Sequence, residues 1–196
     1  MQGGHSMSAP EDSIELASIA QWAKWLDANH TRATGVYLIL AKKSTGAGLD
    51  YQEILETALC YGWIDAIRKS HTEKTFLQRF TPRGKRSIWS KINRDKATAL
   101  IGSGRMLPTG LAEVERAKHD GRWDRAYDRQ GAAEVPEDLA AAFKKNKKAK
   151  AFFETLDSRN RYAVLFRLQT ALKAETRARR LATFVEMLAN EQRLYP

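Results

Sequence analysis

The chain has 196 residues, a formal net charge of +10 and a hydrophobic fraction of 43 %. This length fits one domain or two small units that share a core, and the apolar fraction excludes a chain that is disordered as a whole. No apolar run approaches the roughly 18–20 residues that a membrane helix needs, so we expect no membrane insertion. The first residues lack the apolar stretch of a secretory signal, which predicts a cytoplasmic protein.

Charge is distributed unevenly along the chain. Residues 1–78 hold 7 Lys and Arg against 9 Asp and Glu, whereas residues 79–196 hold the other 26 against 14. The second part favours an anionic partner, although a solvated basic surface explains the same excess. Cys60 is the only cysteine, which excludes an intramolecular disulfide and a cysteine-based metal cage. We expect neither a metal nor a cofactor.

The first half of the chain alternates helix and strand signals. Ser18-Ile-Ala-Gln21 has the form of a capping box, and apolar residues at helical spacing predict a helix that continues to about residue 29. Asp50-x-x-Glu53 opens a second helix, which we expect Gly62 to end. Runs of β-branched and aromatic residues predict three strands of a small antiparallel sheet, at residues 36–41, 63–67 and 75–80.

The part that follows Pro82 predicts helices throughout. The predicted helices span residues 87–101, 108–119, 136–146, 148–156, 158–173 and 176–190. The fold class is therefore α+β, with a small antiparallel sheet packed with helices and then an all-helical C-terminal region. We expect a disordered tail or cloning scar at residues 1–13, an α+β domain at 14–120, a linker at 121–135 and a helical region at 136–196.

Residues 79–96 form the densest basic segment, with seven Lys and Arg and one acid, Asp95. A helix predicted to begin near Ser87 would offer free backbone N–H groups and a positive dipole end to an anion. Arginines add bidentate recognition of phosphate or carboxylate. The segment therefore predicts an anion site, and the interleaved Trp89 also suits nucleic acid. A solvated basic face is the alternative.

A second basic cluster lies at a predicted helix junction. It consists of Lys144, Lys145, Lys147, Lys148 and Lys150, with Phe152 and Phe153 just beyond. We interpret the phenylalanines as core residues and the lysines as solvent-exposed.

Catalysis has weaker support. Cys60 lies beside an apolar helix face, which favours a buried thiol over a nucleophile. His71 and His119 lack the i, i+4 histidine partner of a metal-binding helix. Asp65 lies on a strand that we expect to be buried, where it needs a partner such as an arginine from residues 79–94. An uncharacterised enzyme that uses Cys60, Asp65 or His71 stays an alternative.

Several segments together resemble one family. They are Glu56-Thr-Ala-Leu-Cys-Tyr-Gly-Trp-Ile-Asp65, Arg79-Phe-Thr-Pro-Arg83, Ser87-Ile-Trp-Ser-Lys-Ile-Asn93, Gly104-Arg-Met106 with Gly110, Asn160-Arg-Tyr162 and Thr176-Arg-Ala-Arg-Arg180. From about Ile14 onward the chain resembles the YdeI/OmpD-associated family, also called bacteriocin-protection proteins. The resemblance implies a role in resistance to antimicrobial peptides or other stress, without an established enzymatic activity. Members of that family have been predicted to be periplasmic.

We therefore expect a non-enzymatic protection protein that binds an anionic or aromatic small ligand in an Arg/Trp cleft. Arginines would contact the anion, tryptophans would form stacking walls, Asp65 would orient the arginines, and hydroxyl and amide groups would donate hydrogen bonds. The predicted ligand-binding residues are Trp63, Asp65, Arg79, Arg83, Arg86, Ser87, Trp89, Ser90 and Asn93. A nucleic-acid-binding module that uses residues 79–96 and 144–150 as phosphate contacts is the first alternative, and a protein partner stays open. The net charge weighs against direct capture of cationic peptides.

Overall fold

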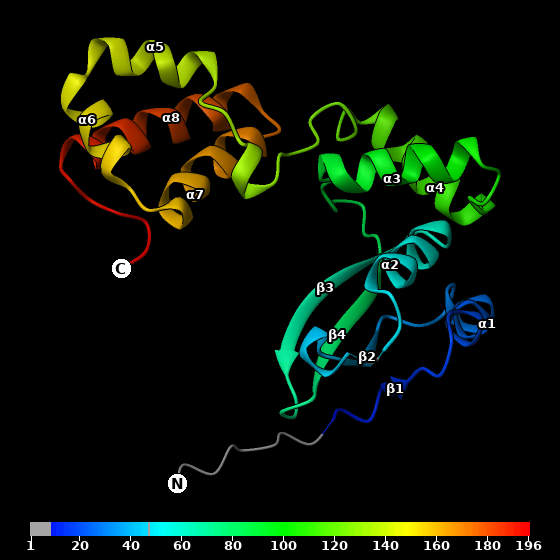
Figure 1. Cartoon of the computed structure of the whole chain (residues 1–196). Coiled ribbons are helices and arrows are strands. Elements are labelled where there is room, and N and C mark those ends of the chain that lie inside the picture. The colour runs from blue at the N-terminus through cyan, green and yellow to red at the C-terminus, as the bar shows by residue number, and fades with distance from the viewer. Residues whose placement is uncertain (1–8, 47) are drawn as a thin grey trace, which may run out of the picture. The chain divides into compact units, whose positions relative to one another are not determined.

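The computed structural model describes residues 9–46 and 48–196 and confirms the predicted α+β class (Figure 1). Of the predicted N-terminal tail, residues 1–8 lie outside the described residues. The strands are β1 (Ser13–Glu15), β2 (Val36–Ala41), β3 (Trp63–Ser70) and β4 (Thr75–Pro82). The α-helices are α1 (Ile19–Asn29), α2 (Tyr51–Cys60), α3 (Lys91–Gly102), α4 (Pro108–His119), α5 (Glu137–Lys145), α6 (Lys147–Thr155), α7 (Ser158–Gln169) and α8 (Ala174–Ala189). Short 3-10 turns lie at Lys43–Thr45 and Gln130–Ala132.

The chain divides into two compact units. The sheet unit comprises residues 1–87 and 96–116, and the helical unit comprises residues 88–95 and 117–196. Helix α3 therefore contributes its first turn to the helical unit and the rest of its length to the sheet unit. The domain limits predicted from the sequence are contiguous, whereas these two units interleave along the chain. Within the described part of the chain, no helix combines the length and the apolar character needed to cross a membrane.

The sheet unit contains one four-stranded sheet with the strand order β1-β2-β4-β3. β4 pairs antiparallel with both β2 and β3, so the three predicted strands form the expected antiparallel arrangement. β1 pairs parallel with β2, and sequence reasoning missed it because three residues are too few to show an alternating pattern. The register sets Phe80 opposite Val36 and Asp65, and it sets Trp63 opposite Pro82. Because side chains alternate along a strand, these residues share one face of the sheet.

Helices α1 and α2 cover this face of the sheet (Figure 1). Trp22 of α1 is fully buried, its indole N–H donates to the carbonyl oxygen of Ile54 at 3.1 Å, and its ring lies 5.5 Å from that of Phe80. The hydroxyl of Ser18 accepts a hydrogen bond from the backbone N–H of Gln21 at 3.2 Å, which confirms the predicted helix start. The two helices and the sheet therefore meet around a single tryptophan.

Two glycines allow α2 and α4 to approach each other. Gly62 ends the α2 region, as predicted, with a φ of +76°, which residues other than glycine rarely adopt. Gly110 of α4 packs against the last turn of α2, where an added Cβ would meet the carbonyl oxygen of Cys60 and would lie 2.7 Å from that of Leu59. The N–H of Leu107 donates to the Cys60 carbonyl at 3.2 Å. Hydrogen bonding and the missing side chain together set this close contact.

The helix predicted to begin near Ser87 begins at Lys91 instead. The Ser87 hydroxyl accepts from the N–H of Gly84 at 2.9 Å, which holds these residues in a turn. The next residues pair with another segment of backbone: Tyr127 accepts from the N–H of Lys91 and donates to the carbonyl of Trp89, both at 2.9 Å. An extended backbone is needed for this pairing, so tertiary contacts delay the helix by one turn.

The helical unit is built around one apolar core to which helices α5 to α8 contribute (Figure 1). Its buried residues are Leu139, Phe143, Ala149, Phe153, Leu156, Val164, Leu165, Leu168, Phe184 and Leu188. These residues recur at helical spacing, which is why the sequence predicted all four helices to within a few residues.

We expect Gly110→Ala to lower the free energy of unfolding by about 2–3 kcal/mol or more, because the new methyl group must displace backbone carbonyls. Gly102→Ala is the matched control, since it also lies in a helix and an added Cβ meets nothing within 4 Å. That control should change stability by no more than about 0.5–1 kcal/mol. Urea denaturation followed by circular dichroism measures both variants, and equal effects would contradict the close contact.

Candidate functional site

The residues predicted for the Arg/Trp cleft fall into both units. Trp63, Asp65, Arg79, Arg83, Arg86 and Ser87 belong to the sheet unit, and Trp89, Ser90 and Asn93 belong to the helical unit. A cleft shared by the two groups stays a prediction.

In the sheet unit, Trp63 and Asp65 face the helices. Trp63 is 1 % exposed, its indole N–H donates to the carbonyl of His30 at 3.2 Å, and its ring lies edge-on to Trp25 at 5.7 Å. Asp65 accepts a hydrogen bond from the hydroxyl of Tyr51 at 2.6 Å. Burial and then this carboxylate raise the pKa of the Tyr51 hydroxyl far above its usual value. The partner found for Asp65 is a tyrosine, where the sequence suggested an arginine.

Arg79 lies on the opposite face of the sheet, beside Tyr37. The Arg79 guanidinium carbon is 5.3 Å from the centroid of the Tyr37 ring, and the Lys69 ammonium is 5.2 Å from it. Hydrogen bonds from Arg79 and then Lys69 lower the pKa of the Tyr37 hydroxyl. Arg79 is therefore held on the sheet by a tyrosine.

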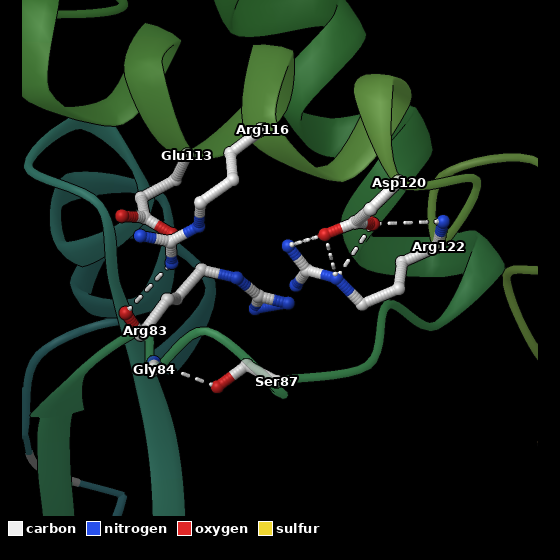
Figure 2. Close-up of polar contacts among 7 residues, drawn as sticks. All are labelled: Arg83, Gly84, Ser87, Glu113, Arg116, Asp120 and Arg122. Atoms are coloured by element: carbon white, nitrogen blue, oxygen red, sulfur yellow. Dashed lines mark hydrogen bonds and ion pairs between the residues drawn. The ribbon is translucent and has the colours of Figure 1, made fainter. Parts of the chain in front are cut away.

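Figure 2 shows the turn that follows β4. Arg83 is 5 % exposed, and its backbone carbonyl accepts a hydrogen bond from Arg116 at 3.2 Å. Arg116 also pairs with Glu113, one turn earlier on α4. Ser87 closes the turn through its hydroxyl, whereas Arg86 is exposed. Of the predicted residues in this turn, Arg86 is the one that presents its cation to solvent.

In the helical unit, the predicted residues surround the start of α3. Trp89 is 2 % exposed and its ring lies edge-on to Trp123, with centroids 5.0 Å apart. The hydroxyl of Ser90 accepts from the backbone N–H of Asn93 at 3.2 Å and so caps the helix. Trp63 and Trp89 are thus both buried, and each ring packs against another tryptophan of its own unit.

Ion pairs hold the segment between α4 and α5 within the helical unit. Arg122, 4 % exposed, pairs with Asp120 at 2.7 Å (Figure 2). Lys91 pairs with Asp128 at 2.7 Å, and the side-chain amide of Gln169 donates to the same carboxylate at 2.8 Å. Much of the stretch predicted as a linker is therefore packed against the first turn of α3 and against α7.

The candidate nucleophile Cys60 is buried, and the candidate acid–base residue His71 contacts a hydroxyl in a turn. Cys60 is 6 % exposed, and burial raises the pKa of its thiol, which opposes formation of a thiolate. His71 lies with its Nδ1 2.9 Å from the hydroxyl of Thr75 in the turn between β3 and β4. Across the described residues, no three His, Cys, Asp or Glu side chains gather in a way that could hold a metal ion.

A pocket of about 340 Å³ opens in the helical unit, among α5, α6 and α7. Its apolar lining includes two buried aromatic rings, Phe143 and Phe153, whose centroids are 5.1 Å apart. The complete lining is Val135, Ala140, Phe143, Lys144, Lys147, Lys150, Phe153, Glu154 and Arg161. The pocket therefore combines an aromatic interior with long charged side chains.

Positive charge dominates the lining of this pocket. It holds four cations against one carboxylate, Glu154, which lies 3.5 Å from Lys150. Both members of that pair are about half exposed, so water screens much of their attraction. Among the residues that the structure describes, Lys144, Lys147 and Arg161 form no ion pair. The pocket is thus a source of uncompensated positive potential.

The corner between α5 and α6 places the lysines around the pocket. Asn146 ends α5 by donating its backbone N–H to the carbonyl of Ala142 at 2.9 Å. Its side-chain oxygen accepts from the N–H of Ala149 at 3.0 Å and so caps α6. Lys144 and Lys147 flank this corner on either side. One residue therefore ends one helix, starts the next and sets the rim of the pocket.

Arg161 reaches the pocket from the first half of α7. Asp157 caps this helix, because its carboxylate accepts from the N–H of Asn160 at 2.7 Å, and that bond lowers the pKa of Asp157. The guanidinium carbon of Arg161 lies 4.8 Å from the centroid of the Phe153 ring. The cation is thereby fixed over the aromatic lining.

Arg177 of α8 ties the helices of the pocket together. Its Nε and Nη2 donate to both oxygens of Asp138 on α5, at 2.7 and 2.9 Å, and its Nη1 donates to the carbonyl of Leu168 on α7 at 2.7 Å. The hydrogen bonds from Arg177 hold the pKa of Asp138 below its usual value.

Sequence reasoning found parts of this pocket without predicting a small-molecule site there. It marked the lysine cluster as a solvated surface and Phe153 as core, and the burial of Phe153 confirms the second interpretation. It noted Arg161 only within a family motif. The available signal was the spacing of three between Lys144, Lys147 and Lys150, next to aromatic residues.

We expect Arg177→Gln to lower the free energy of unfolding by about 1–2 kcal/mol at neutral pH, after allowance for the partial exposure of the ion pair. The folded-state pKa of Asp138 is depressed, so this stabilisation is complete above the usual aspartate pKa of 3.8 and is lost as the pH falls through the folded value. The difference between wild type and variant should therefore shrink in strong acid to what the pH-independent hydrogen bond from Arg177 to the Leu168 carbonyl contributes. Urea midpoints measure this, with the exposed Arg179→Gln as control, and a difference that stays as large in acid as at neutral pH would contradict the role of Asp138.

Comparison with known families places both parts of the chain. Residues 14–113, more than half of the chain, match the model of a family described as a domain of unknown function (DUF8412). Residues 132–191, which include every lining residue of the pocket, match the model described as "Bacteriocin-protection, YdeI or OmpD-Associated". No curated protein and no solved structure matches the chain. The chain therefore belongs to the DUF8412 family and carries, at residues 132–191, a domain of the YdeI/OmpD-associated bacteriocin-protection family.

Proposed function

We propose that this protein is a non-catalytic protection protein that binds a small anionic molecule with an apolar body in the pocket among α5, α6 and α7. The observation that carries the proposal is the lining itself: two buried phenylalanines with four cations around them and a single carboxylate. The pocket lies wholly within the residues that match the bacteriocin-protection model.

The size and chemistry of the pocket support a small-molecule ligand. Its volume of about 340 Å³ is at the lower end of the roughly 300–1,000 Å³ that such pockets have. Apolar and aromatic lining takes up the body of a ligand, and a few polar groups fix its orientation. Here those groups are ammonium and guanidinium ions, which bind carboxylate, sulfonate or phosphate groups.

Electrostatics favour an anionic ligand over a cationic peptide, the kind of ligand that a bacteriocin-protection role would suggest. The whole chain carries a net charge of +10, which repels cations at long range. Protection through this pocket would therefore act on an anionic compound. The Arg/Trp cleft at residues 63–93 would take the same class of ligand, and this cleft stays a prediction. Both of its tryptophans are buried.

The test is isothermal titration calorimetry with 2-naphthoate, an aromatic carboxylate, and with the neutral 2-naphthamide. Lys147→Glu/Lys150→Glu should weaken the binding of 2-naphthoate by at least about tenfold, because two attractive charges become repulsive. Lys145→Glu/Lys148→Glu is the matched control: it makes the same change of net charge on exposed residues outside the lining, and its effect should stay within about twofold. The amide should bind more weakly than the carboxylate.

Equal losses in the two double variants would contradict the pocket. They would indicate instead a diffuse basic surface of the kind that nucleic acid uses, which duplex DNA of mixed sequence at two salt concentrations would then reveal.

A further inference from the structure

We infer that the ligand of this pocket is a planar aromatic anion whose ring stacks on the guanidinium of Arg161. This inference rests on the proposed function and narrows its ligand class.

The guanidinium of Arg161 lies over the aromatic interior of the pocket. Phe153 is 2 % exposed and Phe143 is 4 % exposed, and their rings are tilted by 43° at a centroid distance of 5.1 Å. The guanidinium carbon of Arg161 lies 4.8 Å from the centroid of Phe153. Phe153 therefore contacts both of the other flat groups, the tilted ring of Phe143 and the guanidinium of Arg161. Because its neighbours in the core are buried, Phe153 is a rigid support.

Three arginines, Arg167 of α7 and Arg177 and Arg180 of α8, are engaged in internal hydrogen bonds. Arg177 binds Asp138 and a carbonyl of α7, and Arg180 donates to the carbonyl of Arg167 at 2.6 Å. Arg167 itself donates to the hydroxyl of Tyr195 at 3.3 Å. These contacts join the helices to each other and to the C-terminal residues.

Arg161 differs from these arginines. Within the described part of the chain its guanidinium has neither a hydrogen-bond partner nor an ion-pair partner, although the residue is half-buried and lines the pocket. A guanidinium is planar and weakly hydrated, and it offers N–H donors at its edge and a flat face for stacking. Arg161 can therefore stack on an aromatic ring and donate to an acidic group that the ring carries.

The lysines at the rim complete the recognition. Lys144 and Lys147 have no ion-pair partner among the described residues, and they are exposed at the corner between α5 and α6. An ammonium is a compact charge without stacking geometry, so the lysines attract any anion alike. Selectivity for a flat aromatic body would then come from Arg161 and from the phenylalanines beneath it.

The experiment compares 2-naphthoate with adamantane-1-carboxylate, a rigid acid with the same number of carbon atoms but no flat ring. Calorimetry should show that the wild type binds 2-naphthoate more tightly. Arg161→Lys keeps the charge and removes the planar group. This variant should lower the affinity for 2-naphthoate by about fivefold and should change the affinity for adamantane-1-carboxylate by less than about twofold. Circular dichroism checks that the variant is folded. Arg161→Gln, which removes the charge, is the second variant and should weaken both acids.

Two outcomes separate this inference from the proposed function. The stacking role would be overturned if the wild type bound the two acids with equal affinity, or if Arg161→Lys lowered both affinities equally. In that case the proposed pocket would still stand, provided that Lys147→Glu/Lys150→Glu weakens the binding of both acids. If Lys147→Glu/Lys150→Glu left the affinity for both acids unchanged, the proposal that they bind in this pocket would itself be overturned.

Discussion

The helical unit depends on one corner in the backbone, at Asn146. This residue has φ −123° and ψ 87°, outside the helical region, and it serves at once as the last cap of α5 and the first cap of α6. A continuous helix through this point would carry Phe143 and Phe153 away from each other along one axis, because ten residues of helix extend by about 15 Å. The corner folds the second helix back, so the two rings meet and the nearby lysines surround them.

The arginines and lysines of the helical unit have different tasks. Arg177 pairs with Asp138 and joins α8 to α5, whereas Arg122 pairs with Asp120, two residues earlier, in the turn after α4. Lys144 and Lys147 lie at the surface of the pocket without such partners in the described part of the chain. Some of the cations of this unit therefore form ion pairs that stabilise the fold, and others give the pocket an uncompensated positive potential.

The motif Asn160-Arg-Tyr162 shows both tasks within one turn of helix. Asn160, 1 % exposed, donates to the carbonyl of Tyr195 and accepts from its N–H, which fastens the C-terminal residues. The hydroxyl of Tyr162 donates to the carbonyl of Asp128 at 2.9 Å. Arg161, between them, lines the pocket. Two of these residues stabilise the unit, and the third has the role that we propose in ligand binding.

Sequence reasoning was most successful where one element carries its own pattern. The strand at residues 36–41 and the helix at 108–119 have their predicted bounds, since a run of β-branched and aromatic residues and helical spacing are local properties. It failed where contacts between distant segments determine the local structure. Pairing with Tyr127 moves the start of α3 to Lys91, and the three residues of β1 form a strand by pairing with β2. The pocket was missed for the same reason, because the contacts of Phe153 with Phe143 and Arg161 bring together residues of three helices.

The most direct test of the central claim is an NMR titration of the whole, isotope-labelled protein with 2-naphthoate. Binding in the pocket predicts that changes in backbone amide shifts are largest in residues 143–150, around Phe153 and around Arg161. They should be small in the segment 79–93. Changes centred on residues 79–93, with the amides of α5 to α7 unmoved, would contradict the account and favour an anion site at the basic segment.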